Sequence, residues 1–349
     1  METILLAVDA AAPENDIAAM QAAAAVIQRG GLVAFPTETV YGLGADALNP
    51  HAVAKIYAAK GRPSDNPLIA HVADRAGAGL LVEQITETAG MLMDAFWPGP
   101  LTLILPKKDI VPDATSGGLP TVAVRCPAHP TARLLIALAG TPIAAPSANL
   151  SGRPSPTRAN HVQFDMDGRI DMILDGGASE YGLESTIVDV SGDTPRILRP
   201  GSITKGMLEA ALGRDVLGGA SAALSDEEAP MAPGMKYKHY APAARVVIVS
   251  GAVARVVDAV NALVSEADAD KVGILATEQT KELYPRGQVF VMGDRERPET
   301  IAANLFKMLR KCDYTGLELV YAEPFGETEI GQAVMNRLQK AAGYHTIEV

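Results

Sequence analysis

The chain has 349 residues, about two domains' worth, because single hydrophobic cores stop growing at roughly 250–300 residues. Its 48% hydrophobic and 20% charged residues are an ordinary globular composition, which excludes disordered, collagen-like and coiled-coil architectures. A formal charge of −11, from 30 Lys and Arg against 41 Asp and Glu, argues against a general polyanion binder.

Up to about residue 214, short β-rich runs alternate with helical stretches. Apolar and β-branched runs predict strands at 32–35, 68–72, 101–105, 122–125, 143–145, 172–174, 186–190 and 196–198. Helical patterns predict helices at 15–28, 89–96, 131–139 and 204–212, and Gly30 stands where the first of these should end. The many strands and their uneven spacing predict one large α/β domain built on a mixed sheet.

Residues 215–243 have the composition of a linker. Gly218 and Gly219 are followed by small and acidic residues and by the run APMAPG at 229–234. Beyond Pro242, strands predicted at 246–249, 272–276, 289–292 and 317–321 alternate with helices at 253–264, 300–311 and 329–341. This alternation predicts a small parallel, doubly wound, Rossmann-like sheet. The predicted domains are therefore 1–214 and 244–349, joined by the linker 215–243.

The sequence predicts a soluble cytoplasmic protein. Its two cysteines, Cys126 and Cys312, cannot form a disulfide framework or a Cys-rich zinc site, and both stand in apolar surroundings as reduced core residues. The first basic residue is Arg29, so the N-terminus lacks the basic segment of a signal peptide. The most apolar later run, 134–146, is too short to span a bilayer.

Three long windows contain no Asp or Glu, although the chain is acidic overall. They are residues 114–164, 47–64 and 229–257. A carboxylate would repel a bound anion, so windows without carboxylates suggest anion-binding surfaces. The alternative explanation is chance clustering of solvated basic residues. The Lys and Arg residues in the windows are Lys55, Lys60, Arg62, Arg125, Arg133, Arg153, Arg158, Lys236, Lys238, Arg245 and Arg255.

Two segments in these windows suit phosphate binding. The loop 146–157 follows a predicted strand and offers hydroxyls, the amide of Asn149, Gly152 and the guanidinium of Arg153, which can donate several hydrogen bonds to phosphate oxygens. Lys60-Gly61-Arg62 offers a point charge and a bidentate fork two residues apart. Taken singly, such a loop is also a common turn, and such a basic pair is also a common solvated surface.

Other nucleotide and catalytic motifs are spoiled or missing. Gly42-x-Gly44-x-x-Ala47 has the spacing of a dinucleotide fingerprint, but Pro36 and polar residues spoil the tight turn from strand to helix. The sequence has no Gly-x-x-x-x-Gly-Lys-Ser/Thr, which excludes a P-loop NTPase. It also has no His-Glu-x-x-His, Cys/His cluster or Gly-x-Ser-x-Gly, so protein-held zinc and an α/β-hydrolase are disfavoured.

Taken together, the motifs resemble those of the YrdC family. They follow one another in register over nearly the whole chain, and the last one, followed by a small α/β domain, is similar to the family's long two-domain form. In chain order they are 35–43 (FPTETVYGL), Lys60-x-Arg62-Pro63, Pro67-Leu68, His71-Val72, Arg125-Cys126-Pro127, Ser147-x-Asn149, Ser151-Gly152, 184–189 (ESTIVD), Arg199-Pro200-Gly201 and 233–242 (PGMKYKHYAP).

The resemblance implies an L-threonylcarbamoyladenylate synthase. Such an enzyme is a nucleotidyltransferase that condenses L-threonine, bicarbonate and ATP into threonylcarbamoyl-AMP and diphosphate, for the threonylcarbamoylation of adenosine 37 in tRNA. The family fold is a twisted mixed sheet around a large basic cavity. Because diphosphate leaves with considerable charge, we expect Mg²⁺ held mainly by phosphates and water, with no metal held by the protein alone.

The resemblance also implies the residues of the site. Lys60 and Arg62 are the expected catalytic residues, and Arg125 is expected to hold the threonine carboxylate with its planar fork. Tyr237 in the linker is expected to contact the nucleotide as the linker closes over the cavity. The implied L-threonine ligands are Thr37, His71, Arg125 and Ser185. The implied ATP ligands are Lys60, Arg62, Asn66, Thr121, Ser147, Asn149, Ser155, Arg199 and Tyr237.

Two rival functions deserve comparison with this one. Carbamoyl transfer in hydrogenase maturation uses a similar domain with Cys-rich zinc fingers, which two cysteines rule out. An RNA-binding module would use the basic cavity, but a chain of charge −11 that confines its bases to strand ends favours a small anion. The expected partners are small-molecule substrates and the downstream tRNA threonylcarbamoyl-transfer machinery. No membrane partner is expected, and direct tRNA binding is compatible with this function but not required.

Overall fold

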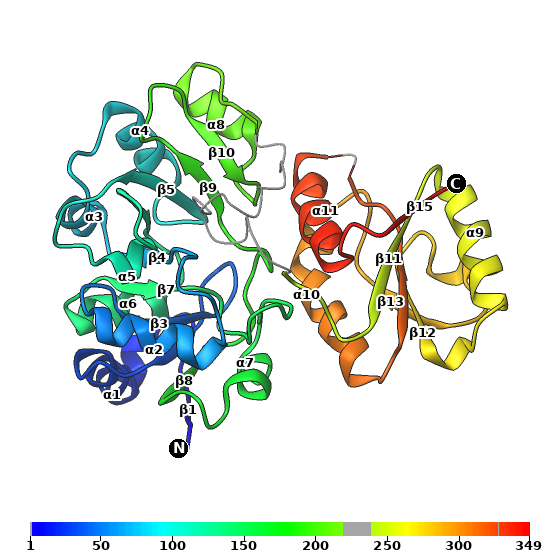
Figure 1. Cartoon of the computed structure of the whole chain (residues 1–349), viewed down its shortest axis with the longest axis horizontal. Coiled ribbons are helices and arrows are strands. Elements are labelled where there is room, and N and C mark those ends of the chain that lie inside the picture. The colour runs from blue at the N-terminus through cyan, green and yellow to red at the C-terminus, as the bar shows by residue number, and fades with distance from the viewer. Residues whose placement is uncertain (1, 219–238, 327) are drawn as a thin grey trace. The chain divides into compact units, whose positions relative to one another are not determined.

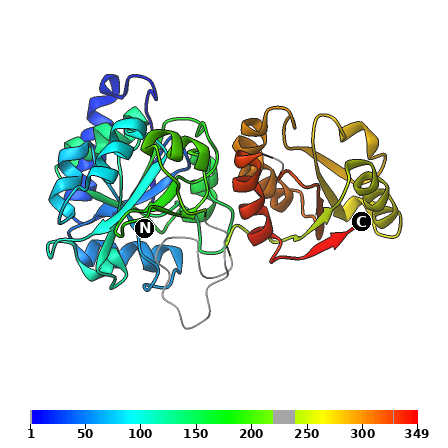
Figure 2. The same cartoon turned by 90° about the horizontal axis from the view of Figure 1, so that it is seen from above.

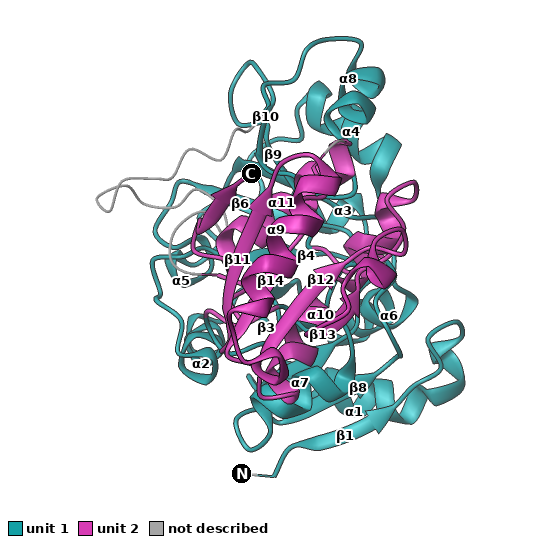
Figure 3. Ribbon diagram, turned by 90° about the vertical axis from the view of Figure 1, so that its right-hand side faces the viewer, with its two compact units in different colours: residues 1–151, 155–180, 184–236 teal, residues 152–154, 181–183, 237–349 magenta. Residues whose placement is uncertain are grey.

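The computed structural model of the chain describes residues 2–218, 239–326 and 328–349. These residues form two compact units, which are coloured separately in Figure 3. Of the described residues, unit 1 comprises 2–151, 155–180 and 184–218, and unit 2 comprises 152–154, 181–183, 239–326 and 328–349. Each unit is built on its own β-sheet.

Unit 1 contains a large mixed sheet, as the sequence predicts (Figure 1). It has ten strands in the order β1-β8-β2-β3-β7-β4-β6-β5-β9-β10. Four neighbouring pairs are parallel, namely β1/β8, β2/β8, β4/β6 and β5/β9, and the others are antiparallel. The strands are β1 (Ile4–Ala7), β2 (Val33–Phe35), β3 (Gly42–Asp46), β4 (Ile69–His71), β5 (Leu101–Pro106), β6 (Thr121–Arg125), β7 (Ile143–Ala145), β8 (Met172–Asp175), β9 (Thr186–Asp189) and β10 (Arg196–Arg199).

Helix α2 of unit 1 has a capping residue at each end. Helix α2 begins after Asn49, whose side chain accepts hydrogen bonds from the amides of His51 and Ala52, and it ends at Gly61 in the left-handed conformation. Lys60 is therefore the last helical residue. The helices are η1 (Pro13–Asp16), α1 (Ile17–Gln28), α2 (Pro50–Lys60), α3 (Arg75–Leu81), α4 (Glu87–Phe96), α5 (Asp113–Ser116), α6 (Pro130–Ala139), α7 (Ala159–Met166) and α8 (Lys205–Leu212).

Unit 1 buries both faces of its sheet, so alternate residues of one strand join different cores. In β2, Val33 and Phe35 pack into a cluster with residues of α1 and α6, whereas Ala34 belongs to a larger cluster on the opposite face. This alternation explains why β2 is apolar at every position.

The half of the sheet formed by β4, β6, β5 and β9 carries a small apolar cluster on the face away from the larger core. Side chains two residues apart on a strand lie on the same face, so His71 of β4 and Arg125 of β6 lie beside this cluster. We call this side of the sheet the site face. The members of the cluster are Ile69, Ile104, Ala123 and Ile187.

Unit 2 is a sheet of five parallel strands in the order β13-β12-β14-β11-β15. Helix α9 lies on one face of this sheet, and α10 and α11 lie on the other, as Figures 1 and 2 show. The elements are β11 (Arg245–Ser250), α9 (Val253–Ser265), η2 (Ala269–Lys271), β12 (Val272–Ala276), η3 (Lys281–Leu283), β13 (Gln288–Val291), α10 (Pro298–Tyr314), β14 (Leu319–Ala322), α11 (Glu329–Ala341) and β15 (Thr346–Glu348).

Both cysteines are buried and free, as the sequence predicts. Burial raises the pKa of the Cys126 thiol to about 11 and that of Cys312 to about 12, so both remain protonated at neutral pH. In the described part of the chain, no helix combines the length and the hydropathy needed to cross a membrane.

Candidate active site

The guanidinium of Arg125 is held from three sides at the end of β6. Nη2 donates to Oε1 of Glu38 at 2.6 Å, Nη1 donates to Oγ1 of Thr39 at 3.0 Å, and Nε donates to the carbonyl of Gly99 at 3.3 Å. Arg125 is 3% exposed and Glu38 is 4% exposed. Two opposite charges are therefore buried together, which is tolerable because they neutralise each other and are hydrogen-bonded.

Glu38 is an ionised carboxylate in this setting. Burial by itself would raise the pKa of Glu38, but the charge of Arg125 and its hydrogen bond outweigh burial and hold that pKa below its ordinary value. The backbone amide of His129 also lies 3.4 Å from Oε2 of Glu38. The ion pair with Arg125 is therefore intact at neutral pH.

Thr37 reaches Arg125 through Thr39. Oγ1 of Thr37 lies 2.6 Å from the carbonyl of Val40, which can only accept, so the Thr37 hydroxyl is the donor there. The oxygen of Thr37 then accepts from the Thr39 hydroxyl at 2.8 Å. A chain of hydrogen bonds thus runs from Arg125 through Thr39 and Thr37 to Val40, and the hydroxyl proton of Thr37 is committed within it.

His71 stands directly opposite Arg125 in the β4/β6 pairing. Its Nδ1 lies 3.1 Å from the carbonyl of Ile69, which can only accept, so we assign the proton to Nδ1. Burial, reinforced by the charge of Arg125, lowers the pKa of His71 to about 3. At neutral pH the ring is therefore uncharged, and its Nε2 is a hydrogen-bond acceptor.

This buried neutral histidine should make stability depend on pH. An unfolded histidine has a pKa near 6.5 and the folded one about 3, so the unfolded state binds the extra proton between these values. The free energy of unfolding should therefore fall as the pH drops from 6.5 toward 3. Replacing His71 with Gln should reduce this slope by up to about 1.4 kcal/mol per pH unit. Urea unfolding of both proteins between pH 4.5 and 7 measures it, and identical slopes would contradict the assignment.

A second buried group lies around Ser185, just before β9. Its Oγ is 2.7 Å from Oγ1 of Thr102, and Nη2 of Arg199 lies 3.2 Å from the same Oγ. Nε of Arg199 also donates to the carbonyl of Ser185 at 3.1 Å. One residue earlier, Glu184 accepts a 2.5 Å hydrogen bond from the hydroxyl of Ser155. These contacts bring three predicted site residues together, namely Ser155, Ser185 and Arg199.

The segment from Gly99 to Thr102 connects the two groups. The carbonyl of Gly99 accepts from Arg125, the carbonyl of Pro100 accepts from the amide of Thr186, and the side chain of Thr102 bonds to Ser185. The predicted threonine ligands around Arg125 and those around Ser185 therefore lie on either side of the start of strand β5. Their distance in sequence conceals this proximity.

Lys60 forms a third buried group with the loop after β7. Its Nζ donates to the carbonyl of Ser147 at 2.5 Å and to the carbonyl of Asn149 at 2.6 Å. Within that loop, the hydroxyl of Ser147 bonds to Oδ1 of Asn149 at 2.6 Å. An isolated bridge between Ser147 and Gly42 attaches the loop to β3. The end of α2 thus meets the phosphate-binding loop predicted from the sequence.

The remaining predicted ATP ligands are less closely grouped. Nη2 of Arg62 donates to the carbonyls of Asn66 and Pro67, at 3.3 and 3.2 Å. The side-chain carbonyl of Asn66 is buried and has no hydrogen-bond partner among the described residues. Thr121 begins β6, four residues from Arg125, or about 13 Å along an extended strand. Tyr237 lies outside the described residues.

Sequence reasoning missed two carboxylates of the site. The windows without acidic residues suggest surfaces where a carboxylate would repel a bound anion, but Glu38 pairs with Arg125 and Glu184 bonds to Ser155. Both acids come from segments outside the window that contains Arg125 and Ser155, so a window counted along the chain does not show which carboxylates lie nearby in space. A single charged residue among hydroxyl residues directly after an apolar strand, as at Glu38, is the signal that could have revealed that carboxylate.

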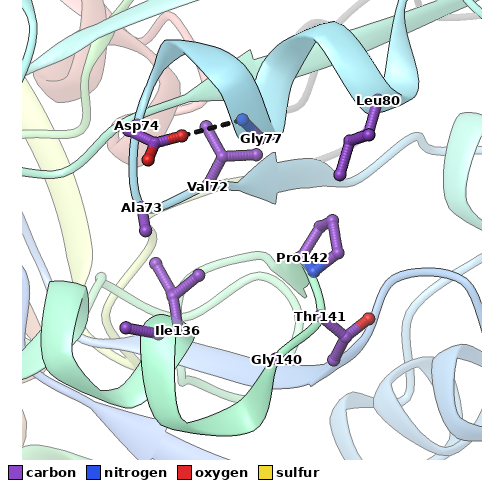
Figure 4. Close-up of a pocket in the computed structure, with 10 residues that line it drawn as sticks. Val72, Ala73, Asp74, Gly77, Leu80, Ile136, Gly140, Thr141 and Pro142 are labelled. Carbon is purple, nitrogen blue, oxygen red and sulfur yellow. Dashed lines mark hydrogen bonds between the residues drawn. The ribbon is translucent and has the colours of Figure 1, made fainter.

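A pocket of about 160 Å³ elsewhere in unit 1 is a poorer candidate. It lies between α3 and α6 and is mainly apolar (Figure 4). Its one charged residue, Asp74, already caps α3 by accepting from the amide of Gly77 at 2.8 Å. The predicted site residues do not line it. A triphosphate needs cations and hydroxyls, so the buried groups around Arg125, Ser185 and Lys60 remain the candidate site.

Two family models match the chain and meet just after β10. The model described as "Telomere recombination", for the Sua5, YciO and YrdC proteins, matches residues 25–201. The model described as "Threonylcarbamoyl-AMP synthase, C-terminal domain" matches residues 203–343. This succession of domains is the two-domain form that the sequence motifs resemble.

Relatives match along almost their whole length. The chain is 49% identical to the threonylcarbamoyl-AMP synthase of Pyrococcus abyssi, over 94% of this chain and 95% of the relative. It is 49% identical to that of Bacillus subtilis over 93% of each. A crystal structure of P. abyssi Sua5 complexed with L-threonine matches 99% of this chain and 100% of its own, at 46% identity and a TM-score of 0.92. The chain therefore belongs to the Sua5/YciO/YrdC family, in the two-domain form of the threonylcarbamoyl-AMP synthases.

Proposed function

We propose that the chain catalyses the condensation of L-threonine, bicarbonate and ATP into threonylcarbamoyl-AMP and diphosphate. The observation that supports the proposal is that cations and hydroxyls from distant segments meet in three buried groups, around Arg125, Arg199 and Lys60. The relatives' names and the threonine complex of the P. abyssi protein support it. The enzyme would be a nucleotidyltransferase, because an adenylyl group passes to the carbamate.

L-threonine would bind on the site face through Thr37, His71, Arg125 and Ser185. Arg125 suits the carboxylate because its planar fork pairs with two oxygens at once. The neutral His71 offers Nε2 as an acceptor for a donor group of the substrate, either the ammonium or the hydroxyl. Because the hydroxyl proton of Thr37 is used by Val40, the contribution of Thr37 would come from its methyl group, its backbone or its hold on Thr39.

ATP would lie along the groups that contain Lys60, Ser147 and Arg199. Lys60 is compact, charged and buried, which suits a phosphate contact in a desolvated site. Asn66 fits a polar contact because its side-chain carbonyl is without a partner among the described residues. The other proposed ATP ligands are Arg62, Thr121, Asn149, Ser155 and Tyr237.

The chemistry needs charge neutralisation more than a strong base. The threonine ammonium and bicarbonate give a carbamate, water and one proton, and a carbamate oxygen then attacks the α-phosphorus of ATP. The bond from that phosphorus to the bridging oxygen breaks, and diphosphate leaves with the electron pair. Since the nucleophile is already an anion, positioned cations that stabilise the developing negative charge supply most of the catalysis.

Magnesium would enter with the nucleotide. Among the described residues, no three His, Cys, Asp or Glu side chains form a group that could hold a metal ion. Neutral hydroxyls such as that of Ser147 fit a cation that keeps its water and phosphate ligands. When bound, Mg²⁺ would offset the charge on the departing diphosphate.

We propose that 1–214 is the catalytic domain, that 215–243 closes over the site and that 244–349 is an accessory domain, in a cytoplasmic enzyme. The product would pass to the machinery that modifies adenosine 37 of tRNA. The mixed sheet would enclose a large basic cavity. The alternative of an RNA-binding module is not favoured, because the relatives are named as synthases.

Incubation with ATP, bicarbonate and amino acids tests the function directly. We expect diphosphate release and an adenylate of threonylcarbamate with L-threonine, and much less of both with L-serine, which lacks the methyl group. One methyl is worth roughly 10- to 200-fold in discrimination. Mass spectrometry of the adenylate and a coupled diphosphate assay are the measurements. Equal diphosphate release without any amino acid would contradict the proposal.

A further inference from the structure

The arginine expected to hold the substrate carboxylate is itself held by protein groups that have no assigned role. Arg125 has five N–H donors, of which Nε bonds to Gly99, one on Nη1 bonds to Thr39 and one on Nη2 bonds to Glu38. One N–H on each terminal nitrogen has no hydrogen bond within the described residues. A carboxylate has two oxygens, so it can accept from two such donors at once, as bidentate pairing requires.

We propose that Glu38 and Thr39 are positioning residues of the threonine subsite, which set the guanidinium of Arg125 for bidentate pairing with the substrate carboxylate. The inference rests on the proposed function. It assigns the two residues an action through Arg125, without contact with the substrate.

The physical need for positioning comes from the arginine side chain. A guanidinium on a flexible stem can rotate about several bonds, and a pairing that needs two parallel hydrogen bonds tolerates little misalignment. Glu38 fixes one terminal nitrogen by charge and geometry, and Thr39 fixes the other through the hydroxyl chain that ends on Val40. Both groups are almost completely buried, so water cannot replace them.

Glu38 has a second consequence that makes the inference testable. If the carboxylate only neutralised Arg125, removing its charge would strengthen the attraction between Arg125 and an anionic substrate, and the threonine KM would fall. If it orients the guanidinium, removing it lets the fork turn away, and the threonine KM rises. The sign of the change therefore distinguishes the two roles.

The test compares Glu38→Gln, Thr39→Val and Thr39→Ser with the wild-type enzyme. We expect Glu38→Gln to raise the threonine KM by about 10- to 100-fold, since misplacement of a binding group by about 1 Å costs up to 100-fold, and to leave the ATP KM unchanged. Thr39→Val, which keeps the volume and loses the hydroxyl, should raise the threonine KM, and Thr39→Ser should restore it. Calorimetric titration of threonine without ATP should show the same order of affinities.

A buried carboxylate in unit 2 provides a matched control. Glu323 is 1% exposed, forms an ion pair with Arg295 and accepts from the hydroxyl of Tyr284 at 2.7 Å. Both Glu323→Gln and Glu38→Gln should lower the midpoint temperature of thermal unfolding. Only Glu323→Gln should leave the threonine KM unchanged.

Each outcome decides the inference. An unchanged or lower threonine KM in Glu38→Gln would overturn it, as would equal losses for threonine and ATP. If Glu38→Gln does not fold, the Val and Ser variants of Thr39 decide the question. Turnover by the wild-type enzyme tests a different claim. An inactive wild type would contradict the proposed function. Active variants with unaltered threonine affinity would contradict only the positioning role.

Discussion

Lys60→Ala should reduce threonine-dependent diphosphate release by about 100- to 1,000-fold, the usual cost of removing one preorganised donor from developing negative charge. Lys60 is 3% exposed, and its ammonium sits on the carbonyls of Ser147 and Asn149, in the loop proposed to bind phosphate. The variant loses both the positive charge and the two hydrogen bonds that attach Lys60 to that loop. A coupled diphosphate assay at saturating threonine and ATP measures the loss.

Lys55→Ala is the matched control for this variant. Lys55 lies on the same helix α2, and its ammonium also donates to a backbone carbonyl, that of Gly30 at 2.6 Å. It has no partner in the candidate site, so its removal should leave turnover unchanged. Wild-type turnover by a folded Lys60→Ala enzyme would remove Lys60 from the active site.

Arg125→Met should weaken threonine binding by about 2–5 kcal/mol, or at least about 30-fold, because a buried charged partner of the carboxylate is lost. It should also destabilise the fold by about 3–5 kcal/mol, since it leaves Glu38 buried without its counter-charge. Threonine titration and urea unfolding measure the two effects separately.

The double variant Arg125→Met/Glu38→Gln separates binding from stability. With both charges removed, no uncompensated ion remains in the interior, so the free energy of unfolding should return toward the wild-type value. Threonine binding should stay lost, because nothing replaces the guanidinium. Recovery of threonine binding together with stability would mean that Arg125 serves only the fold.

Where elements were predicted well, local patterns were sufficient. The strands at 143–145 and 272–276 and the helix at 329–341 have the predicted bounds, because each is an apolar or amphipathic run with a clear boundary. Strand β3 was missed because its two glycines resemble a turn. The structure shows why they are there: a Cβ on Gly44 would lie 2.7 Å from the side chain of Ile143 and 2.8 Å from that of Phe35. Packing within the sheet requires glycine at this position.

The sequence analysis also missed helix α2, although the sequence contains typical start and end residues for it. Asn49 and Pro50 are favourable residues for a helix start, and Gly61 is a favourable residue for its end. The weakly amphipathic Ala-rich run between them concealed the helix. The consequence matters for function, because the end of this helix positions Lys60.

The family resemblance, the mixed and parallel sheets, and a set of charged and hydroxyl residues suited to an amino acid and a nucleotide all follow from the sequence alone, because motifs, periodicity and residue chemistry are local properties. Only the tertiary structure decided which of these residues meet. Glu38 and Arg125 are 87 positions apart and Ser185 and Thr102 are 83 apart. No local pattern encodes such pairs, since strand order and register bring their segments together.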